Sequence, residues 1–402
     1  MNILFLTLVN ISSVEDRGIY QDLLRKFRNE GHRLFIVNPV ERSVGRNTYL
    51  TESGRVKVLK VKTFNIQKTN IIEKGVGTLA IEFQYLKAIK KYFSDIKFDL
   101  ILYSTPPITF SKVINFIKKR DNAISYLLLK DIFPQNAVDM KMIKKGSLLH
   151  KFFVRKEIKL YSSSDYIGCM SEANKAYLLK SNPEIKNNKI EVNPNTISPL
   201  KFNVTKAEID SIRNKYNIPT NKKVFVYGGS LGKPQGIDFL IETIDKTKNI
   251  DAYFLIVGSG TMFTAIEKWF AINKPPNAIL LSGLPKVDYD RLLSACDVGL
   301  IFLHRDFLIP NFPSRLLSYL EMKMPIIAAT DVNTDVGKVI EDNKCGFWVE
   351  SGDINRMIKV ITVLITDDKL LKNMRDNSLK LLEENYTVDI SYNLIKTKLD
   401  NV

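Results

Sequence analysis

The residues best suited to bind a charged ligand lie in a glycine-rich loop past the middle of the chain. The apolar run 224–227 leads into Gly228 to Gly236, and a helical pattern follows from Ile237. A loop that joins a buried strand to a helix offers unpaired backbone N–H groups and the positive end of a helix dipole. We therefore expect this loop to bind an anion, and a phosphate-bearing ligand is the first candidate.

The elements that must position this loop alternate between strands and helices. In the first half, strands are predicted at 2–9, 33–38, 56–63, 99–103, 124–129, 165–170 and 190–197. In the second half, they are predicted at 224–227, 252–257, 278–282, 297–302, 325–328 and 346–349. Strands that alternate with helices form mostly parallel, doubly wound sheets. The predicted fold class is therefore α/β, with two Rossmann-like domains that face a central cleft.

The length of the chain suits two domains of ordinary size. We expect the first domain at 1–200, the second at 201–385, and a closing helix at 386–402 that packs back on the first domain. Ligands bind at the carboxyl ends of strands in open parallel sheets. The turns at 258–260 and 283–285 are therefore expected beside the glycine-rich loop.

The composition is typical of a globular protein in a reducing compartment. Of the 402 residues, 45% are hydrophobic and 25% are charged. The three cysteines are too few and too scattered for a disulfide framework or a metal site, so we interpret them as buried apolar side chains. No apolar run reaches the length of a membrane span, and 2–9 is better explained as a buried strand than as a signal peptide. These features predict a cytoplasmic protein.

Positive charge is concentrated in the first half of the chain. The net charge is +16, and residues 1–200 hold 33 Lys and Arg against 18 Asp and Glu. Between Lys141 and Lys159, basic residues alternate with apolar ones such as Leu148 and Phe152. This pattern predicts a helix on an anionic membrane surface; the alternative is a helix docked on its own domain with a solvated lysine face. Nucleic acid is not expected as a partner, because no nucleic-acid-binding fold or base-stacking platform accompanies the charge.

Several motifs follow one another in the second half. They are the loop 228–236, Gly258-Ser259-Gly260, Gly283-Leu284-Pro285, the stretch Asn311 to Leu320, the stretch Met324 to Ala328, and the stretch Cys345 to Asp353. Their order and spacing resemble the GT-B glycosyltransferases of the large retaining family 4, especially bacterial enzymes that build capsule or O-antigen repeat units. The resemblance extends over nearly the whole chain.

In such enzymes the second domain binds a nucleotide-sugar. The resemblance implies that Pro313, Ser314 and Arg315, at a helix start, present N–H groups and a cation to the diphosphate. Lys233 would supply a second positive charge, and these groups would stabilise the charge that builds on the diphosphate as the sugar leaves. The other donor-binding residues that the resemblance implies are Gly229, Ser230, Gly258, Leu284, Pro285 and Ser318. Outside this context, Arg315 and Lys233 would be ordinary surface cations.

The chain departs from the family at several positions of the donor site. Gln235 stands where a lysine is usual, and Ser230 stands where an arginine is often found. Pro310 and Ser318 replace a pair of glutamates, of which the second grips the ribose hydroxyls; Glu321 lies one helical turn further on. These departures leave open a glycosyltransferase-like binding subunit that has lost catalysis.

The first domain carries a second set of candidates. The stretch Tyr126 to Gln135 resembles the strand-end segment of repeat-unit enzymes, so Asp131 would orient the acceptor hydroxyl or the donor sugar, and Lys130, in place of the usual histidine, would assist the phosphate. The alternative for Asp131 is a helix cap. In the early loop, Gly18 would let the backbone approach the sugar, and Arg17 lies beside it. Either Asp16 or Glu15 would accept the acceptor proton. A capping turn before the next helix explains this loop equally well.

The predicted function is a retaining transfer of sugar from a nucleotide diphosphate sugar, with UDP the first candidate, to a polyprenyl-diphosphate-linked glycan acceptor. The resemblance implies a peripheral location on the inner face of the cell membrane. No cofactor or metal is expected, because the three histidines lack metal-ligand spacing and GT-B enzymes stabilise the leaving diphosphate with side chains and helix ends. A dinucleotide oxidoreductase is the weaker alternative, since neither glycine loop gives G-x-G-x-x-G followed by a well-placed acidic residue.

Overall fold

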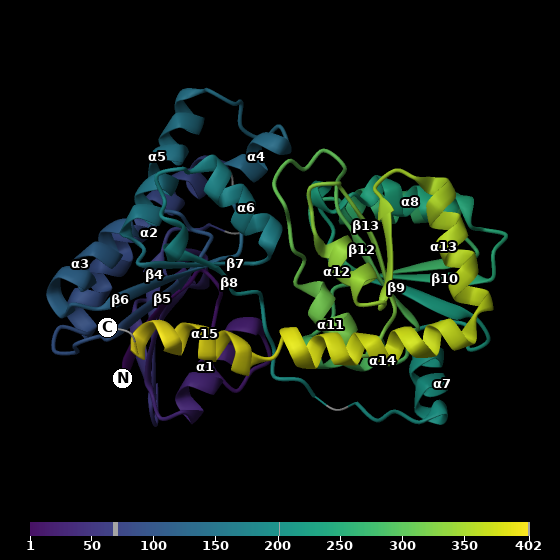
Figure 1. Cartoon of the computed structure of the whole chain (residues 1–402), viewed down its shortest axis with the longest axis horizontal. Coiled ribbons are helices and arrows are strands. Elements are labelled where there is room, and N and C mark those ends of the chain that lie inside the picture. The colour runs from purple at the N-terminus through teal and green to yellow at the C-terminus, as the bar shows by residue number, and fades with distance from the viewer. Residues whose placement is uncertain (67–70, 201, 401–402) are drawn as a thin grey trace. The chain divides into compact units, whose positions relative to one another are not determined.

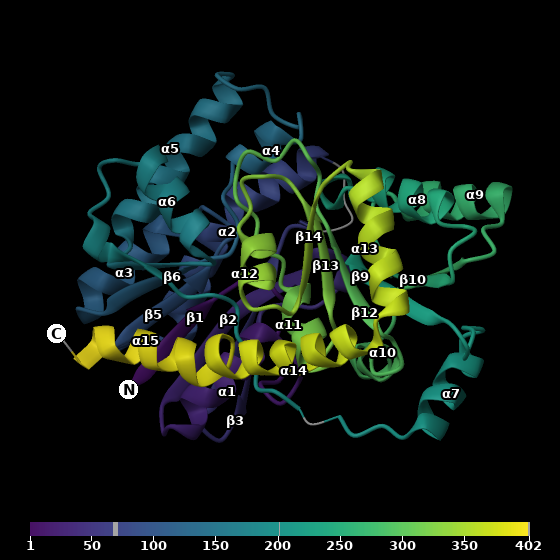
Figure 2. The ribbon, with the colours of Figure 1, turned by 45° about the vertical axis from the view of Figure 1, so that its right-hand side comes forward.

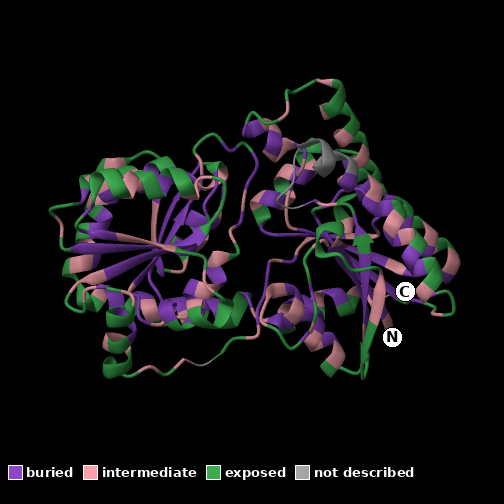
Figure 3. Cartoon of the chain, turned by 180° about the vertical axis from the view of Figure 1, so that it is seen from behind, coloured by how far each residue is buried: buried purple, intermediate pink, exposed green. Residues whose placement is uncertain are grey.

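The computed structural model describes residues 1–66, 71–200 and 202–400. The chain divides into two compact units. The N-terminal unit is Met1–Ser198 together with the chain from Val388 onward, and the C-terminal unit is Pro199–Thr387. Each unit is built on a sheet whose central strands are buried and whose covering helices expose their outer faces (Figure 1, Figure 3).

The N-terminal unit holds an eight-stranded sheet in the order β3-β4-β2-β1-β5-β6-β7-β8. Its strands are β1 Asn2–Leu6, β2 Arg33–Glu41, β3 Tyr49–Ser53, β4 Val56–Thr63, β5 Leu100–Ser104, β6 Ile124–Leu129, β7 Tyr166–Cys169 and β8 Ile190–Val192. Its helices are α1 Ile19–Asn29, α2 Ile71–Tyr92, α3 Ser111–Asp121, α4 Gln135–Asp139, α5 Leu148–Ser163, α6 Glu172–Ser181 and α15 Val388–Asp400. All neighbouring strands are parallel except β3 and β4.

Strand β3 is absent from the strands predicted above. It forms an antiparallel hairpin with β4 through the two-residue turn Gly54–Arg55, in which Gly54 has a φ of +56°. Glycine adopts this left-handed conformation without steric cost. The turn therefore adds an edge strand whose exposed, polar sequence carries no strong strand signal.

The closing helix α15 belongs to the N-terminal unit. At its start, the Val388 N–H donates to the carbonyl oxygen of Ile197 at 3.0 Å. The Tyr392 ring packs edge-on against Phe27 of α1 with 4.9 Å between centroids, and Lys26 pairs with Asp389 at 2.6 Å. Burial of Tyr392 and Ile395 against α1 fixes the helix on this unit.

The C-terminal unit holds a six-stranded, fully parallel sheet in the order β11-β10-β9-β12-β13-β14. Its strands are β9 Lys223–Ser230, β10 Ala252–Ser259, β11 Ala278–Ser282, β12 Val298–Phe302, β13 Ile326–Thr330 and β14 Gly346–Glu350. Its helices are α7 Lys206–Lys215, α8 Ile237–Lys246, α9 Phe263–Asn273, α10 Lys286–Leu293, α11 Arg315–Glu321, α12 Val336–Asp342, α13 Ile354–Thr366 and α14 Asp368–Asn385.

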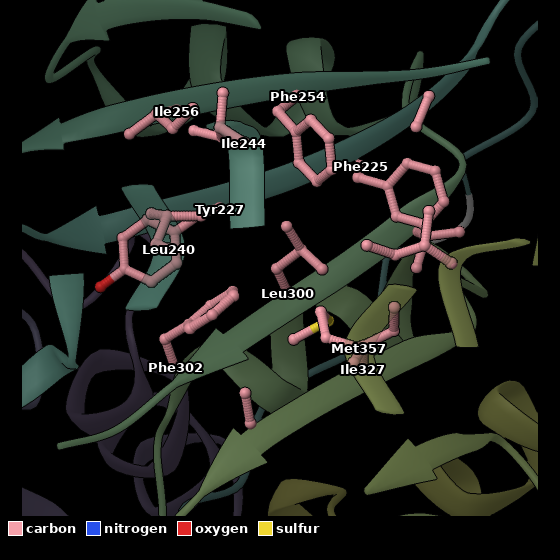
Figure 4. Close-up of a cluster of buried hydrophobic side chains, with 14 of the residues drawn as sticks. Phe225, Tyr227, Leu240, Ile244, Phe254, Ile256, Leu300, Phe302, Ile327 and Met357 are labelled. Carbon is pink, nitrogen blue, oxygen red and sulfur yellow. The ribbon is translucent and has the colours of Figure 1, made fainter. Parts of the chain in front are cut away.

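One face of this sheet carries the main core of the unit. Side chains of β9 and β12, among them Tyr227 and Leu300, meet Leu240 of α8 and Met357 of α13 (Figure 4). Helices α8 and α13 lie side by side over this face (Figure 2). Because side chains alternate between the two faces of a strand, this burial fixes the register of β9 and β12 and so the positions of their ends.

Candidate functional site

The sheet of the C-terminal unit reverses its strand order between β9 and β12. From β9 the chain adds β10 and β11 on one side, and from β12 it adds β13 and β14 on the other. The loops that leave the two central strands therefore diverge, and ligands of such sheets bind in the crevice at their carboxyl ends. Strand β9 ends at Ser230, so the predicted glycine-rich loop lies at this crevice.

Glycines allow the strand ends to approach one another here. Gly229 has a φ of +121°, which other residues rarely adopt. A Cβ on Gly258 of β10 would overlap the carbonyl oxygen of Gly229, and a Cβ on Gly236 would lie 2.8 Å from the carbonyl oxygen of Leu303. The tips of β9, β10 and β12 are thus held at backbone contact distance.

Arg315 extends from the first residue of α11 to the tip of β9. The central carbon of its guanidinium lies 4.3 Å from the centre of the Tyr227 ring. A Cβ on Gly229 would lie 3.7 Å from its Nη2. Its Nη1 is buried and has no hydrogen-bond partner among the described residues. A buried donor without a partner costs about 1–3 kcal/mol, so this nitrogen is well suited to receive an anionic ligand.

The loop after β9 exposes two of the predicted side chains. Lys233 opens the short turn Lys233–Gln235, and both Lys233 and Ser230 are exposed. Gln235, in the position where the family usually has lysine, accepts a hydrogen bond from the Gly232 N–H at 3.1 Å. This glutamine therefore closes the loop on itself, and Lys233 remains the cation that the loop offers.

At the start of α11, a side chain is the main hydrogen-bond donor available to a ligand, rather than the backbone N–H groups. Ser314 is the N-cap and makes no side-chain cap hydrogen bond. The N–H groups of Leu316 and Leu317 donate to the carbonyl oxygens of Pro313 and Ser314, each at 3.2 Å. Because the turn uses these two N–H groups, the guanidinium of Arg315 is the main donor at this helix start.

The remaining predicted donor residues share the carboxyl edge of the sheet. Gly258 pairs with Ser282 at the end of β11, and the half-buried Leu284 and exposed Pro285 follow that strand. Gly258 lies on β10, directly beside β9, whereas Leu284 and Pro285 follow β11, two strands away from β9 in the sheet order. Ser318 is partly buried on α11.

Glu321 does not compensate for the glutamate that Ser318 replaces. It is buried, and its Oε1 accepts a hydrogen bond from the Leu200 N–H at 2.8 Å. This carboxylate therefore anchors the segment through which the chain enters the unit.

Three tyrosines near Arg315 were missed by sequence reasoning. Besides Tyr227, they are Tyr289 of α10, whose hydroxyl would overlap a Cβ on Gly228, and Tyr319 of α11, whose hydroxyl lies 3.2 Å from the Gly228 nitrogen. A glycine inside a strand often marks the close approach of another group. Gly228 of β9 and Gly299 of β12 were the signals for Tyr289 and Tyr319, because nothing in the spacing of the tyrosines relates them to these strands.

The sheet of the N-terminal unit reverses its order between β1 and β5, and Asp131 lies close to this point. The Thr105 hydroxyl, just after β5, accepts hydrogen bonds from the N–H groups of Lys130 and Asp131 at 3.0 and 3.1 Å. Both carboxylate oxygens of Asp131 lie 2.8 Å from the Asn136 amide nitrogen. Asp131 does not cap a helix, since the N-cap of α4 is Pro134.

Lys130 and Asp131 are not brought together, although they are adjacent in sequence. The Lys130 ammonium donates to the carbonyl oxygen of Asn193 at 3.3 Å. Its side chain therefore points to β8 and the residues after it, while the Asp131 carboxylate points to α4.

The early loop places its three candidates at the start of α1. Asp16 is exposed, and its carbonyl oxygen accepts a hydrogen bond from Arg25 at 3.2 Å. Arg17 is half-buried. Gly18 is the N-cap, without a side-chain cap bond, so the Asp16 carboxylate does not cap this helix.

The described residues hold no group of three or more His, Cys, Asp or Glu side chains that could bind a metal ion.

Comparison with known proteins identifies a glycosyltransferase domain within the C-terminal unit. Residues 208–381 match the model of the glycosyl transferases group 1 family. The chain is 23% identical to WbjE of Pseudomonas aeruginosa, named a probable glycosyltransferase, over 81% of this chain and 79% of WbjE. It is 24% identical to the capsular polysaccharide biosynthesis glycosyltransferase CapM of Staphylococcus aureus, over 61% of this chain and 64% of CapM.

Residues 208–381 form a glycosyl transferases group 1 domain, and the chain is a glycosyltransferase.

A solved structure extends the likeness to the fold of both units. HepE of Anabaena in complex with UDP superposes with a TM-score of 0.72 at 14% identity and covers all of both chains. The predicted fold class, GT-B with two Rossmann-like domains, is confirmed.

Burial shifts the pKa values of Lys130 and Asp131 in the N-terminal unit of this glycosyltransferase. It raises the pKa of Asp131 to about 6, against the opposing effect of the Asn136 hydrogen bonds. It lowers the pKa of Lys130 to about 7. At neutral pH, Asp131 is therefore mostly ionised and Lys130 is close to half protonated.

We expect Asp131→Asn to raise the thermal stability of the glycosyltransferase at pH 7.5 and to leave it nearly unchanged at pH 4. The pKa of Asp131 is raised to about 6 in the folded state, so between about pH 4 and 6 the folded state holds a proton that the unfolded state has lost. Stability therefore falls as the pH rises through this window. Asparagine avoids this penalty, with a gain of about 1–2 kcal/mol after allowance for partial exposure.

Thermal unfolding at the two pH values measures this effect. Asp16→Asn, at an exposed position, is the matched control and should change neither midpoint. A stabilisation by Asp131→Asn of the same size at pH 4 would show that the ionisation of Asp131 is not its cause.

Proposed function

We propose that this glycosyltransferase moves a sugar from a UDP-sugar to a hydroxyl of a polyprenyl-diphosphate-linked glycan, with retention at the anomeric carbon. The reaction would extend a repeat unit of a bacterial surface polysaccharide. The structures of HepE with UDP and with UDP-glucose support the donor class, and the name of CapM supports the polysaccharide.

The observation that carries this proposal is the Arg315 guanidinium. It lies beside Gly229 at the crevice, with a buried Nη1 that has no partner in the described part of the chain. Lys233, on the same loop, adds a second cation. Two cations and a loop that requires glycine suit a diphosphate, whose oxygens could complete the hydrogen bonds of the guanidinium.

In the proposed reaction, the acceptor oxygen attacks the anomeric carbon on the face from which the diphosphate leaves. The bond between that carbon and the diphosphate oxygen breaks, and its electron pair passes to the diphosphate. The acceptor proton passes to the departing phosphate. Arg315 and Lys233 would stabilise the negative charge that develops. Asp131 would orient the acceptor hydroxyl or the sugar, and Asp16 is the alternative to the phosphate as acceptor of that proton.

A transfer assay with a panel of UDP-, GDP- and dTDP-sugars tests this function. We expect turnover with a UDP-sugar and an acceptor glycan on a polyprenyl diphosphate, and a product with the anomeric configuration of the donor. Nucleotide binding without turnover on any acceptor would favour the binding subunit instead. Turnover only with a GDP-sugar or a dTDP-sugar would show that the donor carries a different nucleotide. A product with inverted anomeric configuration would overturn the proposed mechanism.

The location of the acceptor is proposed from the surface around α5. The α5 patch combines exposed apolar and basic side chains with the half-buried Lys156: Met142, Lys144, Lys145, Leu148, Leu149, Lys151, Phe152, Arg155 and Lys156. Leu148 is 87% exposed and Met142 is 75% exposed. Leu160 and Tyr161, on the inner side of the helix, are buried. Apolar side chains among basic residues suit the boundary between anionic headgroups and acyl chains. Each basic residue there contributes about 1 kcal/mol to the free energy of membrane binding.

Helix α3 carries a second basic cluster, Lys112, Lys118, Lys119 and Arg120, and two of its members have internal partners. Lys118 pairs with Asp165 at 2.6 Å, and Arg120 pairs with the neighbouring Asp121 at 2.6 Å. These two cations therefore stabilise the fold. Among the described residues, no helix is both long enough and apolar enough to span a membrane.

We expect the protein to float with liposomes that contain anionic lipid at low salt, and to lose this binding when Lys144, Lys145, Lys151 and Lys156 are changed to Gln. The expected loss of affinity is at least 100-fold, since four cations near an anionic surface contribute about 1 kcal/mol each. A matched control changes four lysines of the C-terminal unit, Lys359, Lys369, Lys372 and Lys380, all of which are exposed. Equal loss in both variants, or retention in the first, would contradict the α5 patch as the docking surface.

A further inference from the structure

The two central strands of the C-terminal sheet pair over a short distance only. Strand β9 pairs with β10 from Lys223 to Ser230, but it pairs with β12 only at Phe225 with Val298 and at Val226 with Gly299. The next step of a parallel ladder would join Tyr227 and Leu300, which lie on these two strands (Figure 4). That step would include a hydrogen bond from the Gly228 N–H to the Leu300 carbonyl oxygen.

A side chain occupies this next step. The Tyr319 hydroxyl accepts a hydrogen bond from the Gly228 N–H at 3.2 Å. The same hydroxyl lies 3.1 Å from the Leu300 carbonyl oxygen and 3.2 Å from the Val226 carbonyl oxygen, and it can donate to either. A single oxygen therefore stands between backbone groups that would otherwise meet directly.

The ring of Tyr319 prevents the strands from closing. A Cβ on Gly299 would overlap this ring, so the ring lies directly against the backbone of β12. Tyr319 is completely buried, and burial raises the pKa of its hydroxyl to about 12. The hydroxyl therefore stays protonated at physiological pH and can both donate and accept.

The same helix face also carries Arg315. Residues four positions apart lie on one face of a helix, so Arg315 and Tyr319 of α11 both reach β9. Arg315 stacks on the Tyr227 ring at 4.3 Å, while the Tyr319 hydroxyl contacts the backbone on either side of Tyr227. The two contacts fix α11 against the segment that leads to Gly229.

We propose that Tyr319 is a positioning residue for the donor: its hydroxyl replaces a hydrogen bond of the β9–β12 ladder and holds the strand tips at the separation that places Gly229 and Arg315 around a diphosphate. The inference rests on the proposed nucleotide diphosphate donor for its function, but its geometric part can be tested without any ligand.

The first test is hydrogen–deuterium exchange of the free protein, with and without Tyr319→Phe. The phenyl ring of the variant still packs on Gly299, so the strands stay apart and the Gly228 N–H loses its acceptor. We expect exchange in the peptide 224–231 to become at least 10-fold faster. The matched control is Tyr253→Phe, a buried tyrosine near the start of β10, which pairs with Val224 at the end of β9 away from Gly228. Unchanged exchange in Tyr319→Phe, or the same increase in the control, would overturn the proposal.

The second test measures the dissociation constants of UDP and of uridine. For Tyr319→Phe we expect an approximately 10-fold weaker binding of UDP and a similar rise in the donor KM, with uridine binding unchanged. If Tyr319 acts through Arg315, the double variant with Arg315→Ala should bind UDP no more weakly than Arg315→Ala alone. Unchanged UDP binding, or losses that simply add, would overturn the positioning role. A third outcome separates the two proposals. If the unsubstituted protein binds no UDP but exchange is still faster in Tyr319→Phe, the proposed donor is refuted and the structural role of Tyr319 stands.

Discussion

Arg315→Ala is expected to lower kcat/KM for the nucleotide-sugar donor by about 100- to 1,000-fold, the loss that follows removal of one group that stabilises developing charge. The guanidinium lies at the crevice between β9 and β12, and its Nη1 has no hydrogen-bond partner in the part of the chain that the structure describes. In the alanine variant the departing diphosphate would lose this cation, and kcat is expected to fall more than donor affinity.

The stability of the variant distinguishes a catalytic loss from an unfolding one. Among the described residues, the Arg315 guanidinium stacks on Tyr227 and forms no ion pair with a carboxylate. Its removal therefore leaves no buried carboxylate unpaired, and we expect the unfolding midpoint to change by only a few degrees. Arg315→Lys keeps one charge but loses the forked donor and should recover part of the activity. Arg291→Ala, at an exposed position in the last turn of α10, is the matched control and should retain full activity. Full activity in Arg315→Ala would refute its role at the diphosphate.

Gly258→Ala is expected to destabilise the C-terminal unit by at least about 3 kcal/mol, because the new methyl group would overlap the backbone carbonyl of Gly229. Strands β10 and β9 are each paired on both sides, so neither can move away. For a unit of this size, the loss corresponds to a fall of roughly 6–12 °C in the unfolding midpoint. Donor turnover should fall as well, since the same overlap displaces Gly229 from Arg315.

Gly283→Ala provides the control for this prediction. A Cβ at Gly283 would meet its nearest neighbour, the Ser259 hydroxyl oxygen, at 3.7 Å, which is an ordinary contact. We therefore expect a change within about 0.5 kcal/mol at this second glycine of the carboxyl edge. Differential scanning calorimetry of both variants measures the difference, and equal midpoints would show that the contact between Gly258 and Gly229 tolerates an added carbon.

Local sequence patterns were sufficient for most of the fold. Buried strands such as 252–257 and 278–282 are short apolar runs between turn residues, and helices between them carry one apolar face. Because strands and helices alternate along the chain, neighbouring strands pair in parallel. The carboxyl ends of parallel strands all lie at the same edge of the sheet. The glycine-rich loop was predicted at this edge for the same reason, since the residues from the end of β9 to the start of α8 are consecutive in sequence.

The edge strand β3 could not be predicted in this way. Its side chains are half-buried or exposed, so it lacks the alternation that identifies a strand. A hairpin at a sheet edge depends on its turn and on its partner strand more than on its own sequence.

The partners of the site residues were decided only by the tertiary structure. Lys130 and Asp131 are neighbours in sequence, yet their side chains contact Asn193 and Asn136. Glu321 lies near the expected ribose-binding position, but it binds the backbone of Leu200 instead. The contacts of Lys130 and Glu321 join residues 63 and 121 positions apart, and no local pattern predicts them.

The amino-acid sequence thus determined which residues follow each strand, because strand, loop and helix are consecutive segments whose apolar periodicity is visible along the chain. Which side chains meet at the strand ends was decided by the packing of α11 on β9 and β12. Tyr227 of β9 is separated by more than eighty residues from Arg315 and Tyr319 of α11. Only the folded unit brings these side chains within hydrogen-bond and stacking distance of β9.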